Sequence, residues 1–196
     1  MPYPPVHEIT DRITDSATPA YSSEERSFLI DVARRAIEAA LEKREYHPEA
    51  ITPNLNEPRA VFVTLHIGGQ LRGCVGQIIA TEPLAQAVAH SAVSAAFGDP
   101  RFAPLAAQEF SLLQIEISVL SPIKPIRPRD VVPGVHGLIV ASGGRRGLLL
   151  PQVATEFGWG AETFLEQTCR KAGLPSDAWK DQGAEIYGFT AEKFGE

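Results

Sequence analysis

The sequence lacks the features of a membrane protein, a secreted protein or a disulfide-stabilised domain. It has no apolar run of the roughly 20 residues that a membrane helix needs, so we expect no membrane association. Its start lacks the basic residues and the apolar core of a signal peptide. The two cysteines, Cys74 and Cys169, lie far apart and do not resemble a disulfide framework. We therefore expect a soluble, cytoplasmic protein with free thiols.

Basic residues and cofactor motifs are also scarce. The chain has 18 Lys and Arg against 24 Asp and Glu, a net charge of −6, whereas binding to phosphate backbones needs clustered cations. It contains no phosphate loop, no dinucleotide-binding fingerprint, no serine nucleophile elbow and no zinc-type cysteine or histidine pair. We therefore predict no nucleic-acid partner and no cofactor. A metal site would have to be assembled from distant residues such as His66, Cys74 and His136.

Two amphipathic helices are predicted in the first half of the chain. Apolar residues recur at helical spacing over about 23–44, directly after a capping box formed by Ser22 and Glu25. A second helix begins near Pro83 and presents a face of small residues, which permits close packing on a sheet. Residues 1–21 are polar, contain proline and have no periodicity, so we predict that they form a loose leader.

Alternating apolar and polar residues predict antiparallel strands joined by tight glycine turns. The turns are Gly68-Gly69 and Gly143-Gly144, and a proline-rich connector covers 122–128. The predicted strands cover 60–67, 70–80, 113–119, 137–142, 146–150 and 185–190.

These elements predict an α+β fold of two subdomains. The larger one, an antiparallel sheet with packed helices, would comprise 22–121 and 182–196. The smaller one, an inserted unit of β-hairpin and helix, would comprise 122–181.

The stretch 71–77, Leu-Arg-Gly-Cys-Val-Gly-Gln, contains the first candidate site. Two glycines weaken a strand and usually mark a bulge or a close approach by another group. The regular register from the preceding turn pairs Val63 with Cys74 and places the thiol on the aliphatic face. A bulge at Gly73 would instead move Cys74 to the side of His66. The sequence leaves both registers open.

Cys74 is predicted to be a nucleophile or a covalent acceptor. Its thiolate could be stabilised by Arg72, which could also bind an anionic substrate group. Gly73 and Gly76 could expose backbone N–H groups that bind an anion. In the alternative interpretation, Cys74 is a small buried residue and the glycines let a helix pack closely.

His66 and Glu116 are candidates for proton transfer. His66 could act as a base or a ligand, or be only a half-exposed strand residue. Glu116 lies between two isoleucines, so burial would require it to be paired or protonated. Arg72 and Arg101 are its expected partners, and a structural ion pair is the alternative to a site role.

Two further residues are predicted to contact substrate. His136 lies in a glycine-flanked loop between the connector and the small subdomain, and such loops often line a cleft; alternatively, its side chain satisfies backbone groups. Arg101 is separated from Asp99 by Pro100, so the two side chains could also simply fix this turn.

Several long motifs resemble those of the AMMECR-type domain family, called AmmeMemoRadiSam system protein A in bacteria and archaea. The similarity runs from about residue 22 to the C-terminus, and Val75 stands where the family often has isoleucine. The matching stretches are 62–66, 71–76, 95–102, 115–121, 133–138, 147–152 and 169–179.

The resemblance implies a two-subdomain α+β fold with antiparallel sheets. It also implies two partners: a Memo-type protein, similar to metal-dependent dioxygenases, and a radical-SAM enzyme. It supplies no reaction, because a fold hosts many functions. The leading hypothesis is an enzyme or enzyme component of a modification pathway that uses a cleft around Cys74 for thiol-based or anion-binding chemistry. The alternative is a non-catalytic adaptor for the same partners.

Overall fold

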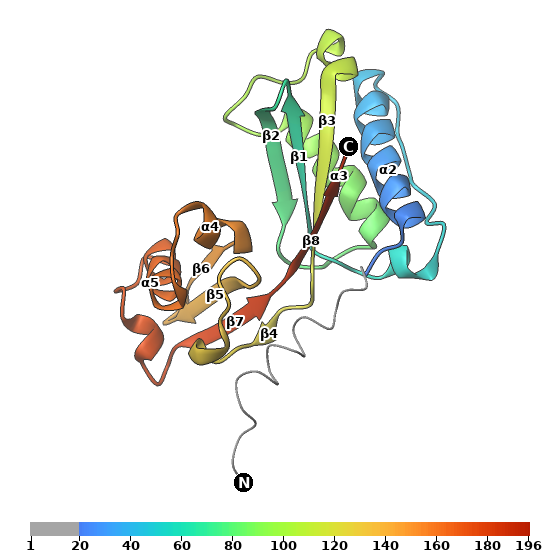
Figure 1. Ribbon diagram of the computed structural model, residues 1–196. Helices are drawn as coiled ribbons and strands as arrows, with labels where there is room; N and C mark the ends of the chain where they lie inside the picture. The colour runs from blue at the N-terminus through green and yellow to red at the C-terminus, as the bar shows by residue number, and fades with distance from the viewer. Residues whose placement is uncertain (1–19) are drawn as a thin grey trace.

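The computed structural model describes residues 20–196, which form two antiparallel sheets with helices packed on them (Figure 1). The predicted α+β class is therefore confirmed. The predicted leader falls largely outside the described residues. Its last residue, Tyr21, is buried in the main core, and the N–H of Ala20 donates to Glu192 at 2.7 Å. Packing therefore extends beyond the helix cap to Ala20 and Tyr21, and the leader itself stays a prediction.

The first sheet has the strand order β2-β1-β3-β8, with all neighbours antiparallel. One of its faces is covered by two helices (Figure 1). Because side chains alternate along a strand, Val61, Val63 and Leu65 all point to that face and are fully buried. The elements are α2 (Ser23–Leu41), β1 (Val61–Ile67), β2 (Gln70–Gln77), α3 (Leu84–Phe97), β3 (Leu113–Leu120) and β8 (Ala191–Gly195).

Helix α2 begins as predicted. The Ser22 hydroxyl accepts the Glu25 N–H at 3.2 Å, and the Glu25 carboxylate accepts the Ser22 N–H at 2.9 Å. The helix ends at Leu41, earlier than expected, and Lys43 then adopts a positive φ of 56°. Short 3₁₀ helices punctuate the loops at Pro53–Asn56, Ala107–Leu112, Pro128–Asp130 and Ala178–Lys180.

The second sheet has the strand order β4-β7-β5-β6. It packs against α5, and its core includes Leu138, Phe164 and Leu165. Both predicted Gly-Gly turns are confirmed, since all four glycines have positive φ. The elements are β4 (Lys124–Pro125), β5 (Gly137–Ser142), β6 (Arg145–Leu149), α4 (Pro151–Glu156), α5 (Ala161–Lys171) and β7 (Glu185–Phe189).

The chain passes twice between the sheets, at Ser121 and at Thr190. The two crossings are tied together, because the Ser121 N–H donates to the Thr190 carbonyl and the Thr190 N–H donates to Ser121 Oγ, each at 2.9 Å. Strand β7 lies in the stretch assigned from sequence to the larger subdomain, yet it pairs with β4 and β5. The switch between sheets thus occurs at Thr190, and the division into subdomains stays a prediction.

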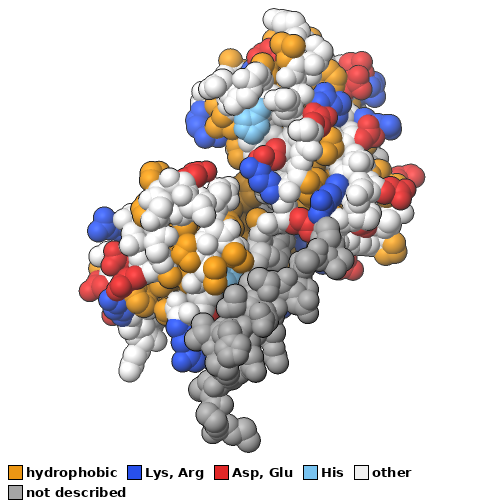
Figure 2. All heavy atoms as spheres, viewed as in Figure 1, with side chains coloured by type: hydrophobic (Ala, Val, Ile, Leu, Met, Phe, Trp, Pro, Cys, Tyr) orange, Lys and Arg blue, Asp and Glu red, His pale blue; other side chains and the backbone are white. Residues whose placement is uncertain are grey.

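An apolar cluster fills the junction. Leu120 and Phe189 are buried there, and Phe62 from the helix-free face of the first sheet packs on them. Among residues 20–196, no helix is both long and apolar enough to cross a bilayer. Acidic and basic side chains are interspersed over the face drawn in Figure 2.

Candidate functional site

The hairpin of β1 and β2 contains a bulge that decides where Cys74 points. Leu71 pairs with His66 and Gly73 pairs with Leu65, so Arg72 is the extra residue. Cys74 therefore lies opposite Thr64, and the regular register that paired it with Val63 is wrong. The bulge alternative is correct, although it falls one residue before Gly73. As a result, the Cys74 side chain points away from the helices and lies on the helix-free face of the sheet, beside Thr64.

Cys74, Thr64 and Glu116 form one row across that face, on three neighbouring strands. The Thr64 hydroxyl donates a hydrogen bond to Cys74 Sγ at 3.2 Å. Glu116 forms an ion pair with Lys193 at 2.8 Å, and not with either of the two arginines expected from sequence. His66 occupies the next row, opposite Leu71. Within residues 20–196 it forms no hydrogen bond with Cys74 or Glu116.

Asp99 closes the exposed edge of β2. Its carboxylate accepts the Cys74 N–H at 2.9 Å, and it accepts the Arg101 Nε and Nη2 groups at 3.0 and 2.7 Å. The Arg101 hydrogen bonds, followed by the Cys74 N–H, hold the pKa of Asp99 well below its usual range. The pKa of Arg101 is raised, chiefly by its hydrogen bonds to Asp99. Arg101 thus fixes the turn and is linked to the Cys74 backbone through the Asp99 carboxylate.

Arg72 does not lie beside the thiol as predicted, because the bulge directs it to Glu109. Its Nε and Nη2 donate to that carboxylate at 2.8 and 3.0 Å, and Glu109 also accepts the Ala106 N–H. Hydrogen bonding by Arg72 is the main cause that lowers the pKa of Glu109 to about 2. The Phe102 ring lies 6.0 Å from the Arg72 guanidinium and 5.5 Å from that of Arg101. Arg72 therefore links the edge strand to the loop after α3.

Both glycines of the motif have a packing role. A Cβ at Gly73 would lie 2.1 Å from the Ala95 carbonyl oxygen in α3. A Cβ at Gly76 would lie 2.2 Å from the Val61 carbonyl oxygen. Between them, the Cys74 N–H is bonded to Asp99 and is not available to an anion. A helix packs closely over Gly73, as the alternative interpretation held, whereas Gly76 lies against the neighbouring strand β1.

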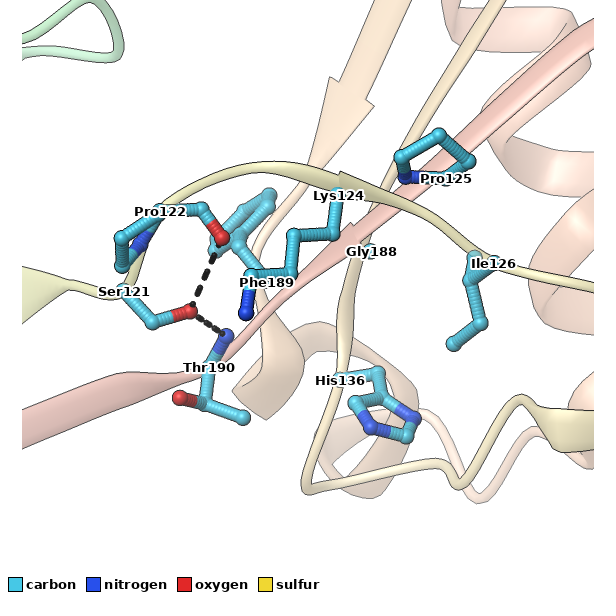
Figure 3. Close-up of a pocket in the computed structure, with 9 residues that line it drawn as sticks. All are labelled: Ser121, Pro122, Lys124, Pro125, Ile126, His136, Gly188, Phe189 and Thr190. Atoms are coloured by element: carbon cyan, nitrogen blue, oxygen red, sulfur yellow. Dashed lines mark hydrogen bonds between the residues drawn. The ribbon is translucent and has the colours of Figure 1, made fainter.

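His136 lies elsewhere, in a pocket of about 230 Å³ where the chain crosses between the sheets (Figure 3). Its Nδ1 accepts the Val132 N–H at 3.0 Å, and burial lowers its pKa. Among residues 20–196, no three His, Cys, Asp or Glu side chains gather in a group that could hold a metal ion. His66, Cys74 and His136 therefore do not form the composite metal site that the sequence left open.

Sequence reasoning missed three partners of the candidate residues. Thr64 donates to Cys74 Sγ, Asp99 accepts the Cys74 N–H, and Lys193 pairs with Glu116. Thr64 could have been found, because moving the register by one residue places it opposite Cys74. Lys193 gave no signal, since the last predicted strand ended at residue 190 and no strand was predicted where β8 lies. Lys124 and Thr190, which line the pocket with His136, are brought together only by the two chain crossings.

The comparisons with known proteins agree along nearly the whole chain. The AMMECR1 family model matches residues 30–194. A protein of Methanothermobacter thermautotrophicus is 45% identical over 184 residues, covering 89% of this chain and 96% of that protein. A protein of Pyrococcus furiosus is 46% identical over 182 residues, covering 86% and 87%. The crystal structure of an uncharacterized Pyrococcus horikoshii protein, 43% identical, superposes with a TM-score of 0.80 and covers 91% of this chain and 94% of that one.

Proposed function

This chain belongs to the AMMECR1 family, and from that premise we propose that it is a component of a modification pathway in which Cys74 is the reactive group. The proposed partners are a Memo-type protein and a radical-SAM enzyme, and they rest on the family resemblance of motifs such as 71–76. The chemistry rests on a single observation. Cys74 Sγ lies on the helix-free face and accepts a hydrogen bond from the Thr64 hydroxyl.

These neighbours suit thiol chemistry better than anion binding. A hydroxyl donor stabilises negative charge on sulfur, and the thiolate is the nucleophilic form of cysteine. The Cys74 N–H, which lies between the two glycines, is already bonded to Asp99. A substrate placed over Cys74 would meet Glu116 on the same row and His66 on the next one. We propose that these two groups handle protons for the substrate.

Thiol alkylation of the native protein tests the proposal. Iodoacetamide labelling, resolved by peptide mass, should modify Cys74, whereas buried Cys169 should stay unlabelled because burial raises its pKa. Thr64→Val keeps the shape of the side chain but removes the hydroxyl. It should slow labelling of Cys74 by about three- to tenfold, the value of one hydrogen bond. Lys180→Gln, which removes a surface ion pair with Glu162, is the matched control and should leave the rate unchanged.

Two results would contradict the thiol role. One is that neither cysteine reacts until the protein unfolds. The other is that Cys74→Ser leaves the output of the pathway unchanged in cells.

A non-catalytic adaptor is the second candidate, and the glycine packing favours it. Because Gly73 and Gly76 are explained by close contacts alone, the motif does not require a substrate. An adaptor should bind the Memo-type or radical-SAM partner through the face around Cys74. In a pull-down, Glu116→Lys should then abolish capture, and no mixture of the three proteins should modify Cys74. A covalent adduct on Cys74 would decide against the adaptor.

A further inference from the structure

We propose that the pocket at the crossing between the two sheets binds a small organic carboxylate with an apolar body. The pocket has a volume of about 230 Å³ and is lined by the chain at 121–126, at His136 and at 188–190 (Figure 3). It is separate from the row of Cys74, Thr64 and Glu116, and its ligand does not depend on the thiol chemistry proposed above. Three features of its walls carry the assignment: one cation, neutral donors and an apolar floor.

The cation is Lys124. Within residues 20–196 its ammonium group forms no ion pair, and Figure 3 shows the side chain turned back over the pocket rather than away from it. No Asp or Glu is among the residues that line the pocket. A cation without a neighbouring carboxylate attracts an anionic group and repels a metal ion. The sign of the ligand's charge follows directly.

The neutral donors are His136 and Thr190. Because His136 Nδ1 accepts the Val132 N–H, the proton of the neutral ring is on Nε2, which can donate to a ligand. Burial lowers the pKa of His136, so the ring is neutral at pH 7 and adds no second charge. The Thr190 hydroxyl has no hydrogen bond within residues 20–196. One ammonium and two neutral donors match a carboxylate better than a doubly charged phosphate.

The floor of the pocket is apolar and depends on a glycine. Pro122, Ile126 and Phe189 contribute carbon surface. A Cβ at Gly188 would lie 3.0 Å from Ile126 Cδ1, so a larger residue would push Ile126 toward the cavity. Ser121 is not a free donor, because its hydroxyl donates to the Pro122 carbonyl at 3.4 Å while it accepts the Thr190 N–H. The space beyond the polar end therefore suits an aliphatic or aromatic group.

Benzoate and hexanoate are suitable probes, and isothermal titration calorimetry with the full chain is the assay. A ligand of this size should bind in the millimolar range. Benzyl alcohol, which has the shape of benzoate without its charge, should bind at least about tenfold more weakly. Lys124→Met should weaken benzoate binding by about tenfold, and Lys124→Arg should restore it. Lys180→Met is the matched control and should bind like the wild type, because that lysine pairs with Glu162 away from the pocket.

Three outcomes would overturn the assignment: neither carboxylate binds, Lys124→Met binds benzoate as well as the wild type does, or inorganic phosphate binds as tightly as benzoate. Lys124 is exposed, so its substitution should not unfold the protein, and circular dichroism verifies this for each variant. Cys74→Ser should bind benzoate normally. Loss of the thiol chemistry and loss of this site can therefore be told apart.

Discussion

Replacing Gly73 with alanine should destabilise the protein strongly, although it adds only a methyl group. The new Cβ would lie 2.1 Å from the Ala95 carbonyl oxygen, well inside any allowed contact, and a backbone atom cannot rotate away. Helix α3 would have to move from β2 by about 1 Å, and overpacking of this kind costs on the order of 3 kcal/mol. For a chain of this length, that corresponds to a fall in Tm of roughly 6–12 °C.

Urea unfolding of matched variants would test this magnitude. Gly183→Ala is the control, because no atom lies within 4 Å of its added Cβ and its φ is not positive. It should be neutral or slightly stabilising. Combining Gly73→Ala with Ala95→Gly should not restore stability, since the clash is with the backbone oxygen and not with the Ala95 side chain. A loss below about 0.5 kcal/mol for Gly73→Ala, typical of a surface substitution, would refute the packing argument.

Two further predictions concern charge and capping. Glu109 has a pKa lowered from 4.5 to about 2, chiefly by Arg72, so its stabilising contribution is complete above its unfolded pKa and is lost as the pH falls through this range. Glu109→Gln should therefore flatten the loss of unfolding free energy between about pH 4.5 and 2, and equal slopes for the two proteins would contradict this. Ser22→Ala should cost about 1 kcal/mol in urea unfolding, because the Glu25 N–H loses its cap; no change in the midpoint would show that solvent replaces the cap.

The sequence was informative where a signal is local. The cap at Ser22 and the two Gly-Gly turns depend on a few adjacent residues, and their geometry follows from backbone sterics. The strand alternation was sufficient to indicate antiparallel sheets. The bulge was harder to place, because it is set by how α3 meets β2 over Gly73, a contact between residues far apart in the chain. The two possible registers could be stated, but sequence alone could not choose between them.

The face on which the candidate residues lie follows from the bulged register, but their pairings could not be predicted. Cys74, His66 and Glu116 do share one face, whereas the partners expected for Glu116 and for the thiol were wrong. Long cationic side chains reach several neighbours, so their partners depend on tertiary distances that sequence spacing does not contain. The pocket of Lys124 and Thr190 is the extreme case, since the residues between them, 125–189, form most of the second sheet.

The bulge separates the packing requirement at Gly73 from the chemical role of Cys74, two residues that are adjacent in the sequence. One extra residue at Arg72 places Gly73 on the helix face, where only the absence of a side chain allows the contact with Ala95. The same shift places Cys74 on the opposite face and directs its N–H off the sheet edge to Asp99. Nothing in the helix contact requires a thiol at the next position. Gly73→Ala therefore tests the fold, and Cys74→Ser tests the chemistry. If the Cys74→Ser protein is stable but the output of the pathway is lost in cells, the thiol serves function rather than packing.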